Sequence, residues 1–179
     1  TEVLDLDEDL YREGKWVVRL YAEAFSPNSP RWMQGSKELV QTESEDDVVV
    51  GLSEHIRESL VSEDHLIIWG SGGTLRAIGE NNGFELTTLG IDATMGSEQV
   101  GTDLDESGIL SILRSHDGPT TLLLSPMGGQ GFLIGRGNLQ LSPAVLESIG
   151  IENILGVLTP AKLLTVRKLR IETGDEGLD

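Results

Sequence analysis

Residues 66–74 are Leu66-Ile67-Ile68-Trp69-Gly70-Ser71-Gly72-Gly73-Thr74. The four apolar residues at the start are typical of a buried strand, and the glycine-rich turn leads into a short helix carrying Leu75 and Ile78. A strand that passes through a turn into a helix is the repeating unit of α/β proteins. This stretch therefore predicts the class of fold, and the chain on either side of it repeats the pattern.

Strands and helices alternate along most of the chain. We expect strands at residues 16–21, 86–91, 120–124, 153–158 and 168–171. Helices are expected from about Ser44, within residues 103–113, and after Thr159-Pro160. The clearest helix starts at Ser142-Pro143 and stops at Gly150, because serine caps a helix, proline suits its first turn and glycine ends it. The sequence predicts one α/β domain over residues 1–179, with a largely parallel sheet flanked by short helices.

A second glycine-rich stretch follows the apolar residues Thr121-Leu122-Leu123-Leu124, and it has five glycines in eleven residues: Gly128-Gly129-Gln130-Gly131-Phe132-Leu133-Ile134-Gly135-Arg136-Gly137-Asn138. Such a loop can direct several backbone N–H groups at one anion. Arg136 adds a planar fork of donors suited to phosphate or carboxylate, and Gln130 and Asn138 add amide groups. The stretch predicts an anion site, and the alternative is an ordinary flexible turn at the surface.

The candidate residues lie just after expected strands. Gly70, Ser71, Gly72, Gly73 and Thr74 follow one strand, Asp92 follows the next, and the second glycine stretch and Thr159 follow two more. In parallel α/β sheets this edge carries the ligand crevice, and helix N-termini there favour anions. Ordinary turns are the alternative for each loop alone, because Gly, Ser and Asp are common turn residues. Lys37, which follows Gly35-Ser36, is a further candidate for phosphate binding.

The net negative charge of the chain limits the kinds of ligand that it can bind. Thirty acidic residues face thirteen basic ones, which gives a formal net charge of −17, and only four of the basic residues are lysines. A broad basic face for nucleic acid is therefore not expected. Acid-rich, lysine-poor surfaces suit high salt, where screening weakens self-repulsion, although a merely acidic protein is the alternative. A phosphorylated ligand would need local arginine, lysine, backbone N–H groups or a divalent cation to overcome the repulsion.

Several classes of site lack their signatures. The chain has no cysteine, which excludes disulfides and thiolate zinc sites and agrees with a cytoplasmic location. No apolar run approaches the length that crosses a bilayer, so no membrane association is expected. There is no Walker A motif, and Leu75 and Gln140 stand where a dinucleotide fingerprint needs a small residue. The three histidines are scattered and expected at the surface, and no metal site is expected.

The second glycine stretch also carries a family resemblance. Residues 125–132, 135–138 and 140–143 resemble the C-terminal half of archaeal and bacterial ATP-NAD kinase-like proteins, the group that includes the acetoin-catabolism protein X. Residues 89–92, 159–163 and 169–175 look like other segments of that half. The resemblance implies a nucleotide-binding C-terminal domain of an ATP- or polyphosphate-dependent, NAD kinase-like phosphotransferase of NADP biosynthesis. ATP or polyphosphate, NAD and Mg²⁺ would be its ligands, and a homo-oligomer its assembly.

One departure from the family bears on catalysis. NAD kinases carry a Gly-Gly-Asp-Gly-Thr motif in an earlier domain, and its nearest echo here has Gly72 in place of the aspartate. Gly-Pro-Gly-Thr-Thr is the commoner family version at this point, so Ser71, Gly73 and Leu75 depart from it as well. The resemblance therefore implies the C-terminal part of a longer protein, and we expect this chain to be inactive alone.

The resemblance also implies roles for the candidate residues. Gly128, Gly129 and Gly131 would hold phosphate or ribose groups together with Arg136, and residues 70–74 would form a second cradle. Asp92 would bind a ribose hydroxyl or a cation. Two alternatives stay open: a non-catalytic regulatory module that binds a small phosphorylated metabolite, and a glycine stretch that only builds a subunit interface.

Overall fold

The computed structural model describes residues 2–15, 17–23, 43–126, 131–166, 168–175 and 177. The chain forms two compact units, residues 1–36 and residues 37–179, and each is described by itself. The expected single domain over residues 1–179 stays a prediction.

The first unit contains a β-hairpin with a helix in its connection. Strands β1 (Glu2–Leu6) and β2 (Val18–Glu23) are antiparallel, and helix α1 (Glu8–Arg12) lies between them in sequence. Asp7 caps α1 by accepting a hydrogen bond of 3.1 Å from the Leu10 N–H, and its other carboxylate oxygen lies 2.6 Å from Arg19 Nε. The strand expected at residues 16–21 corresponds to β2, whereas β1 and α1 were not predicted from the sequence.

Five strands form the main sheet of the second unit, in the order β5-β4-β3-β6-β8. They are β3 (Leu66–Trp69), β4 (Asp92–Met95), β5 (Glu98–Gly101), β6 (Thr120–Leu124) and β8 (Ile154–Gly156). β3 is parallel to β6 and β6 to β8, whereas β4 is antiparallel to both β3 and β5. β4 is thus the one strand that runs against the other four, and the predicted largely parallel sheet is confirmed.

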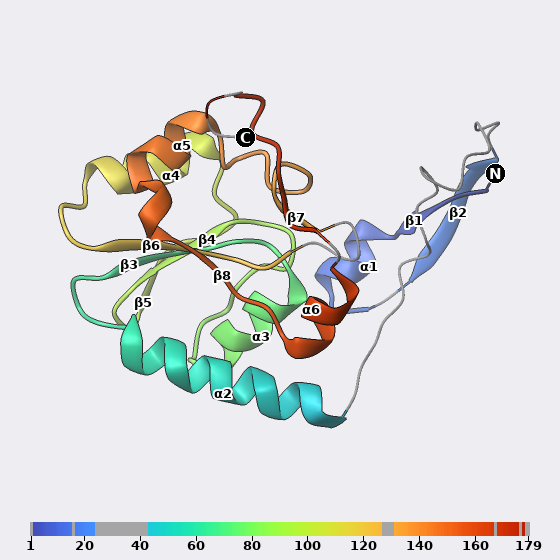
Figure 1. Cartoon of the computed structure of the whole chain (residues 1–179), viewed down its shortest axis with the longest axis horizontal. Coiled ribbons are helices and arrows are strands. Elements are labelled where there is room, and N and C mark those ends of the chain that lie inside the picture. The colour runs from blue at the N-terminus through green and yellow to red at the C-terminus, as the bar shows by residue number, and fades with distance from the viewer. Residues whose placement is uncertain are drawn as a thin grey trace. The chain divides into compact units, whose positions relative to one another are not determined.

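Helices cover both faces of this sheet. α2 (Glu43–Ser59) and α3 (Gly73–Asn81) lie on one face, and α4 (Glu106–Arg114) and α5 (Pro143–Ile149) on the other (Figure 1). Successive strand side chains point to opposite faces, so Ile67 and Trp69 pack with α2 and α3, whereas Ile68 packs with α4 and α5. Each fully buried apolar side chain of this kind contributes about 1.5–3 kcal/mol. The sheet with its two layers of helices confirms the predicted α/β class.

Shorter elements complete the second unit. A 3₁₀ turn η2 (Ile151–Asn153) precedes β8, and α6 (Pro160–Thr165) follows it. β7 (Phe132–Ile134) and β9 (Arg170–Ile171) pair in parallel as a separate two-stranded sheet. β7 lies inside the second glycine stretch, which the sequence analysis took for a loop throughout.

One expected strand is wrong. Residues 86–91 form no strand, and a hairpin of β4 and β5 follows them instead. Leu86 and Ile91 are nevertheless buried, because the irregular segment packs them into the two cores. α4 begins within the expected residues 103–113, and Asp105 caps it, since its side chain accepts the Gly108 N–H at 2.8 Å. α2 begins at Glu43, one residue before Ser44, near which a helix was expected to start.

Candidate functional site

Residues 70–74 and Asp92, among the candidate residues, lie at one rim of the main sheet. β3, β6 and β8 all end there, and because β4 is reversed its first residue, Asp92, pairs with Trp69 at the end of β3. We define the strand-end rim as the segments next to these strand ends, which are residues 70–74, 92, 125–126 and 157–159. In α/β proteins this is the edge at which ligands bind.

The turn after β3 is held by backbone hydrogen bonds. The N–H of Gly70 donates to the Leu123 carbonyl and the N–H of Gly72 donates to the Thr88 carbonyl, both at 2.8 Å. Gly72 has φ +127°, a conformation that other residues rarely adopt. This backbone places Gly73 and Thr74 in the first turn of α3, where N–H groups have no acceptor within the helix. No side chain of the described residues caps that turn, so its amides are suited to an anion.

A contact joins this turn to the second glycine stretch. The Ser71 hydroxyl lies 3.4 Å from the Gly137 carbonyl oxygen, although 66 residues separate the two in sequence. The distance is long for a hydroxyl hydrogen bond, and Ser71 is only 4% exposed. The structure thus brings together the two loops that the sequence analysis selected.

Asn138 braces its own loop. Its side-chain oxygen accepts the Gly135 N–H at 2.8 Å, and its nitrogen donates to the Leu133 carbonyl at 2.9 Å. The side chain is 4% exposed. A ligand contact through Asn138 stays a prediction, since both ends of the amide already hold the turn.

Arg136 lies at the surface beside an aromatic ring. Its guanidinium carbon is 5.4 Å from the centre of the Phe132 ring, and that of Arg170 is 5.7 Å from the same centre. Both arginines are exposed, whereas Phe132 is 7% exposed. Stacking of this kind holds a guanidinium in a fixed orientation. The ring therefore gathers two positive charges in a strongly acidic chain.

Gly131 allows the approach of the segment that carries Arg170. The Gly131 carbonyl accepts the Arg170 N–H at 2.8 Å, and a Cβ at Gly131 would collide with the Lys168 carbonyl oxygen. Its φ is +74°. Gly131 is thus needed for the packing of β9, and a further contact to a ligand stays a prediction.

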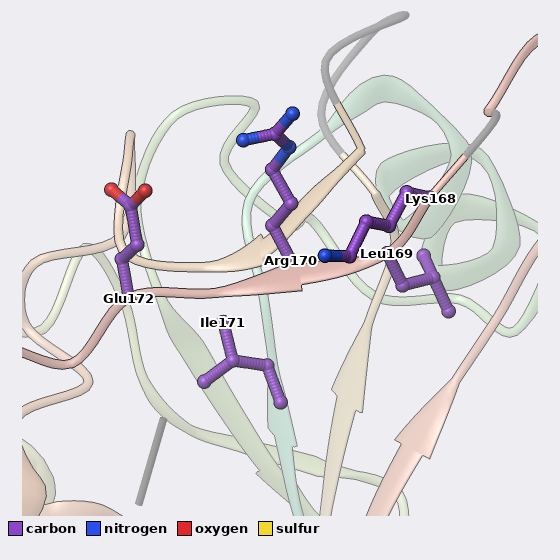
Figure 2. Close-up of a pocket in the computed structure, with 5 residues that line it drawn as sticks. All are labelled: Lys168, Leu169, Arg170, Ile171 and Glu172. Carbon is purple, nitrogen blue, oxygen red and sulfur yellow. The ribbon is translucent and has the colours of Figure 1, made fainter. Parts of the chain in front are cut away.

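A hollow of about 380 Å³ runs along residues 168–172. Figure 2 shows Arg170 and Glu172 on one side of the strand and Ile171 on the other. Leu169 and Ile171 are 48% and 43% exposed, so the hollow combines charged groups with apolar surface. Because Arg170 also stacks on Phe132, the hollow adjoins the ring that holds Arg136.

Asp92 is buried at the rim, with 1% of its surface exposed. One carboxylate oxygen accepts the Thr87 N–H at 2.6 Å and the Thr87 hydroxyl at 2.9 Å, and the other accepts the Asp103 N–H at 2.9 Å. These bonds anchor the irregular segment before β4. A ribose or cation contact through Asp92 stays a prediction, and it would compete with three existing donors.

Other expected site residues lie outside the described residues: Gly128, Gly129, Gln130 and Lys37. Within the described part of the chain, no group of three or more histidine, aspartate or glutamate side chains could hold a metal ion. No described helix is both long and apolar enough to cross a membrane.

A polar cluster that was not predicted from the sequence lies where β6 and β8 end. Lys162 Nζ donates to Ser125 Oγ at 2.9 Å, and the Thr159 hydroxyl donates to Glu45 Oε1 at 2.9 Å. Burial lowers the pKa of the Lys162 ammonium, and the Glu45 carboxylate partly opposes this by raising it. Sequence signals existed: Ser125 follows an apolar strand, and lysine is rare here. Nothing in the spacing linked Lys162 to Ser125, because 37 residues separate them.

Comparison with known proteins identifies one family. The model of the ATP-NAD kinase C-terminal domain matches residues 32–174, which include the whole rim and both glycine stretches. No curated protein and no solved structure matches the chain.

Proposed function

Because this chain belongs to the family of ATP-NAD kinase C-terminal domains, we propose that it binds a nucleotide at the strand-end rim. The observation that carries the proposal is the contact between Ser71 and Gly137, which brings the first turn of α3 beside the loop of Arg136. The amides of that turn and the guanidinium are donors suited to phosphate oxygens. This local set of donors would offset the repulsion from a chain with a net charge of −17.

ATP or polyphosphate and NAD are the proposed ligands, with Mg²⁺ arriving on the phosphates. The described residues do not fit a magnesium site of their own, because no acidic cluster is present among them and the oxygens of Asp92 accept three hydrogen bonds. Magnesium commonly binds through one or two carboxylates and the substrate's phosphates, so we assign no residue of this chain to the metal. The expected homo-oligomer, cytoplasmic location and salt adaptation belong to the same proposal.

A binding module without chemistry of its own is the second candidate. Asp92, the rim carboxylate, is buried and accepts three hydrogen bonds, and the nearest echo of the Gly-Gly-Asp-Gly-Thr motif has Gly72 in place of the aspartate. Phosphoryl transfer depends on positioning and on stabilising charge on the transferred group. The described rim supplies donors for a phosphate but no free acid, which favours binding over catalysis by this chain alone.

Calorimetric titration of ATP and of NAD, with Mg²⁺ and high potassium chloride, tests the proposal. We expect the wild type to bind at least one nucleotide. Arg136→Ala should bind it about tenfold more weakly, since the loss of one charge-assisted hydrogen bond lowers affinity by about this factor. Arg57→Ala is the matched control, because Arg57 is an exposed arginine near the end of α2. The absence of heat with both ligands would overturn the nucleotide proposal.

A further inference from the structure

Lys162 is a partly buried cation to which the proposed nucleotide site assigns no role. It lies in α6, and its ammonium reaches the end of β6, where it donates to Ser125 Oγ at 2.9 Å. Lys162 takes part in none of the salt bridges between described residues, which involve Lys15, Arg19 and Arg76. A buried charge without an opposite charge in contact is costly, and such groups gather at functional sites.

The donors that remain at this pair suit an oxyanion. An ammonium has three N–H donors and no acceptor, so Lys162 retains two donors after its bond to Ser125. The Ser125 oxygen accepts that bond, which leaves its own O–H as a donor. The two neighbouring side chains thus offer three donors, and Ser125 is only 5% exposed.

The nearby hydroxyl of Thr159 already makes hydrogen bonds within the fold. Thr159 donates to Glu45 and accepts the Lys162 backbone N–H as the cap of α6, and it is 1% exposed. Glu45 is the acidic group that acts on Lys162, and its carboxylate oxygen is bonded to Thr159. The Thr159–Glu45 pair therefore positions α6 against α2, while Lys162 and Ser125 keep their unused donors.

We propose that Lys162 and Ser125 form a phosphate-binding site at the carboxyl ends of β6 and β8. The occupant is a phosphate group of the ligand bound at the strand-end rim, so the identity of that ligand rests on the proposed function. Ser125 lies two residues after Leu123, whose carbonyl accepts the Gly70 N–H. The pair is therefore at the same rim as the turn after β3, and one polyphosphate chain could use both sets of donors.

Calorimetry with inorganic tripolyphosphate and with ATP, on the same protein, tests the assignment. We expect Lys162→Met to weaken the binding of tripolyphosphate by at least about tenfold, since charged hydrogen bonds are lost. Lys15→Met is the matched control, because Lys15 is exposed and paired with Glu13 at 2.7 Å. The melting temperature of Lys162→Met should be unchanged or higher, since burial disfavours the charged amine that the substitution removes.

The outcomes separate this inference from the proposed function. Equal binding of tripolyphosphate and ATP to wild type and Lys162→Met would overturn the assignment and leave nucleotide binding intact. Binding of tripolyphosphate that depends on Lys162, without binding of ATP or NAD, would support the assignment and overturn the nucleotide proposal. Failure of the wild type to bind either phosphate compound would overturn the assignment.

Chemical labelling gives a test that does not depend on a variant. Trinitrobenzenesulfonate modifies neutral amines, and the chain has only four lysines to follow by peptide mass. Tripolyphosphate should slow the labelling of Lys162 several-fold and leave that of Lys15 unchanged. Equal rates at Lys162 with and without tripolyphosphate would count against the site.

Discussion

At the scale of single residues, two adjacent glycines illustrate the difference between a required and a replaceable residue. Gly72 has φ +127°, whereas Gly73 begins α3 with helical backbone and open space around the position of a Cβ. Alanine is strained in the first conformation and favoured in the second. Of these two glycines, only Gly72 is therefore needed to turn the chain from β3 into α3.

Gly72→Ala should lower the free energy of unfolding by about 1–3 kcal/mol, the usual cost of a strained backbone. Gly73→Ala, the control, should be neutral or stabilising by up to about 1 kcal/mol, because alanine restricts the unfolded chain. Urea denaturation of both variants measures the difference. Equal loss of stability in the two would contradict the assignment of strain to Gly72.

His65 provides a residue-scale test of pH dependence. Burial lowers the pKa of His65 below its ordinary value, with the nearby Asp64 carboxylate opposing the shift. The unfolded chain therefore binds a proton at this residue more readily than the folded chain. The contribution of neutral His65 to the free energy of unfolding should be fully present above the ordinary histidine pKa of about 6.5. It should decrease as the pH falls below that value.

The variant His65→Gln should show a weaker decrease in the urea midpoint between pH 8 and pH 5 than wild type. His55→Gln is the control, since His55 is exposed on α2 and its pH profile should follow that of wild type. The His65 ring lies 2.9 Å from the Thr121 hydroxyl, so the comparison uses slopes and not absolute stabilities. Parallel profiles for wild type and His65→Gln would refute the interpretation.

At the scale of elements, capping residues explain why several helices could be located from the sequence. α5 begins at Pro143 after the cap Ser142 and ends before Gly150, as predicted. α6 likewise begins at Pro160 after the cap Thr159. These signals act within three or four residues, so they do not depend on the rest of the fold.

Ser142→Ala should reduce the free energy of unfolding by about 1 kcal/mol, because the Val145 N–H loses its side-chain acceptor. The hydrogen bond from Ser142 to Glu106 of α4 is lost as well. Ser148→Ala is the matched control, since Ser148 is exposed within α5 and alanine favours helix. Urea denaturation that gives the same stability for both variants would contradict a capping role for Ser142.

The positions of strands were harder to predict from local sequence than those of helices, because strands depend more on the segments they pair with. β3 and β6 were located correctly because they are continuous apolar runs. The segment at residues 86–91 has similar composition yet stays irregular, since hydrogen bonds to Asp92 and Gly72 replace those of a strand ladder. β5 contains no continuous apolar run, and its pairing with β4 could not be foreseen from local composition.

At the scale of the whole molecule, the net charge of −17 is the dominant property. Repulsion among exposed carboxylates opposes the compact state, and salt screens it within about 10 Å at 0.1 M and about 3 Å at 1 M. The urea midpoint should therefore rise as potassium chloride increases across this range. Glu54→Gln combined with Glu58→Gln, which removes two exposed charges of α2, should make the rise less steep. A midpoint that does not change with salt would exclude self-repulsion as an important influence.

The sequence by itself determined the α/β class, the positions of most described helices and the glycine turn that follows β3. Burial patterns, caps and glycine turns are local, and β3, β6 and α5 carry them clearly. Tertiary structure alone decided the reversed β4, the packing of Arg136 and Arg170 on Phe132, and the meeting of Lys162 with Ser125. The contacts of Arg170 with Phe132 and of Lys162 with Ser125 join residues far apart in the chain, and such pairs are brought together only when the sheet and its helices pack.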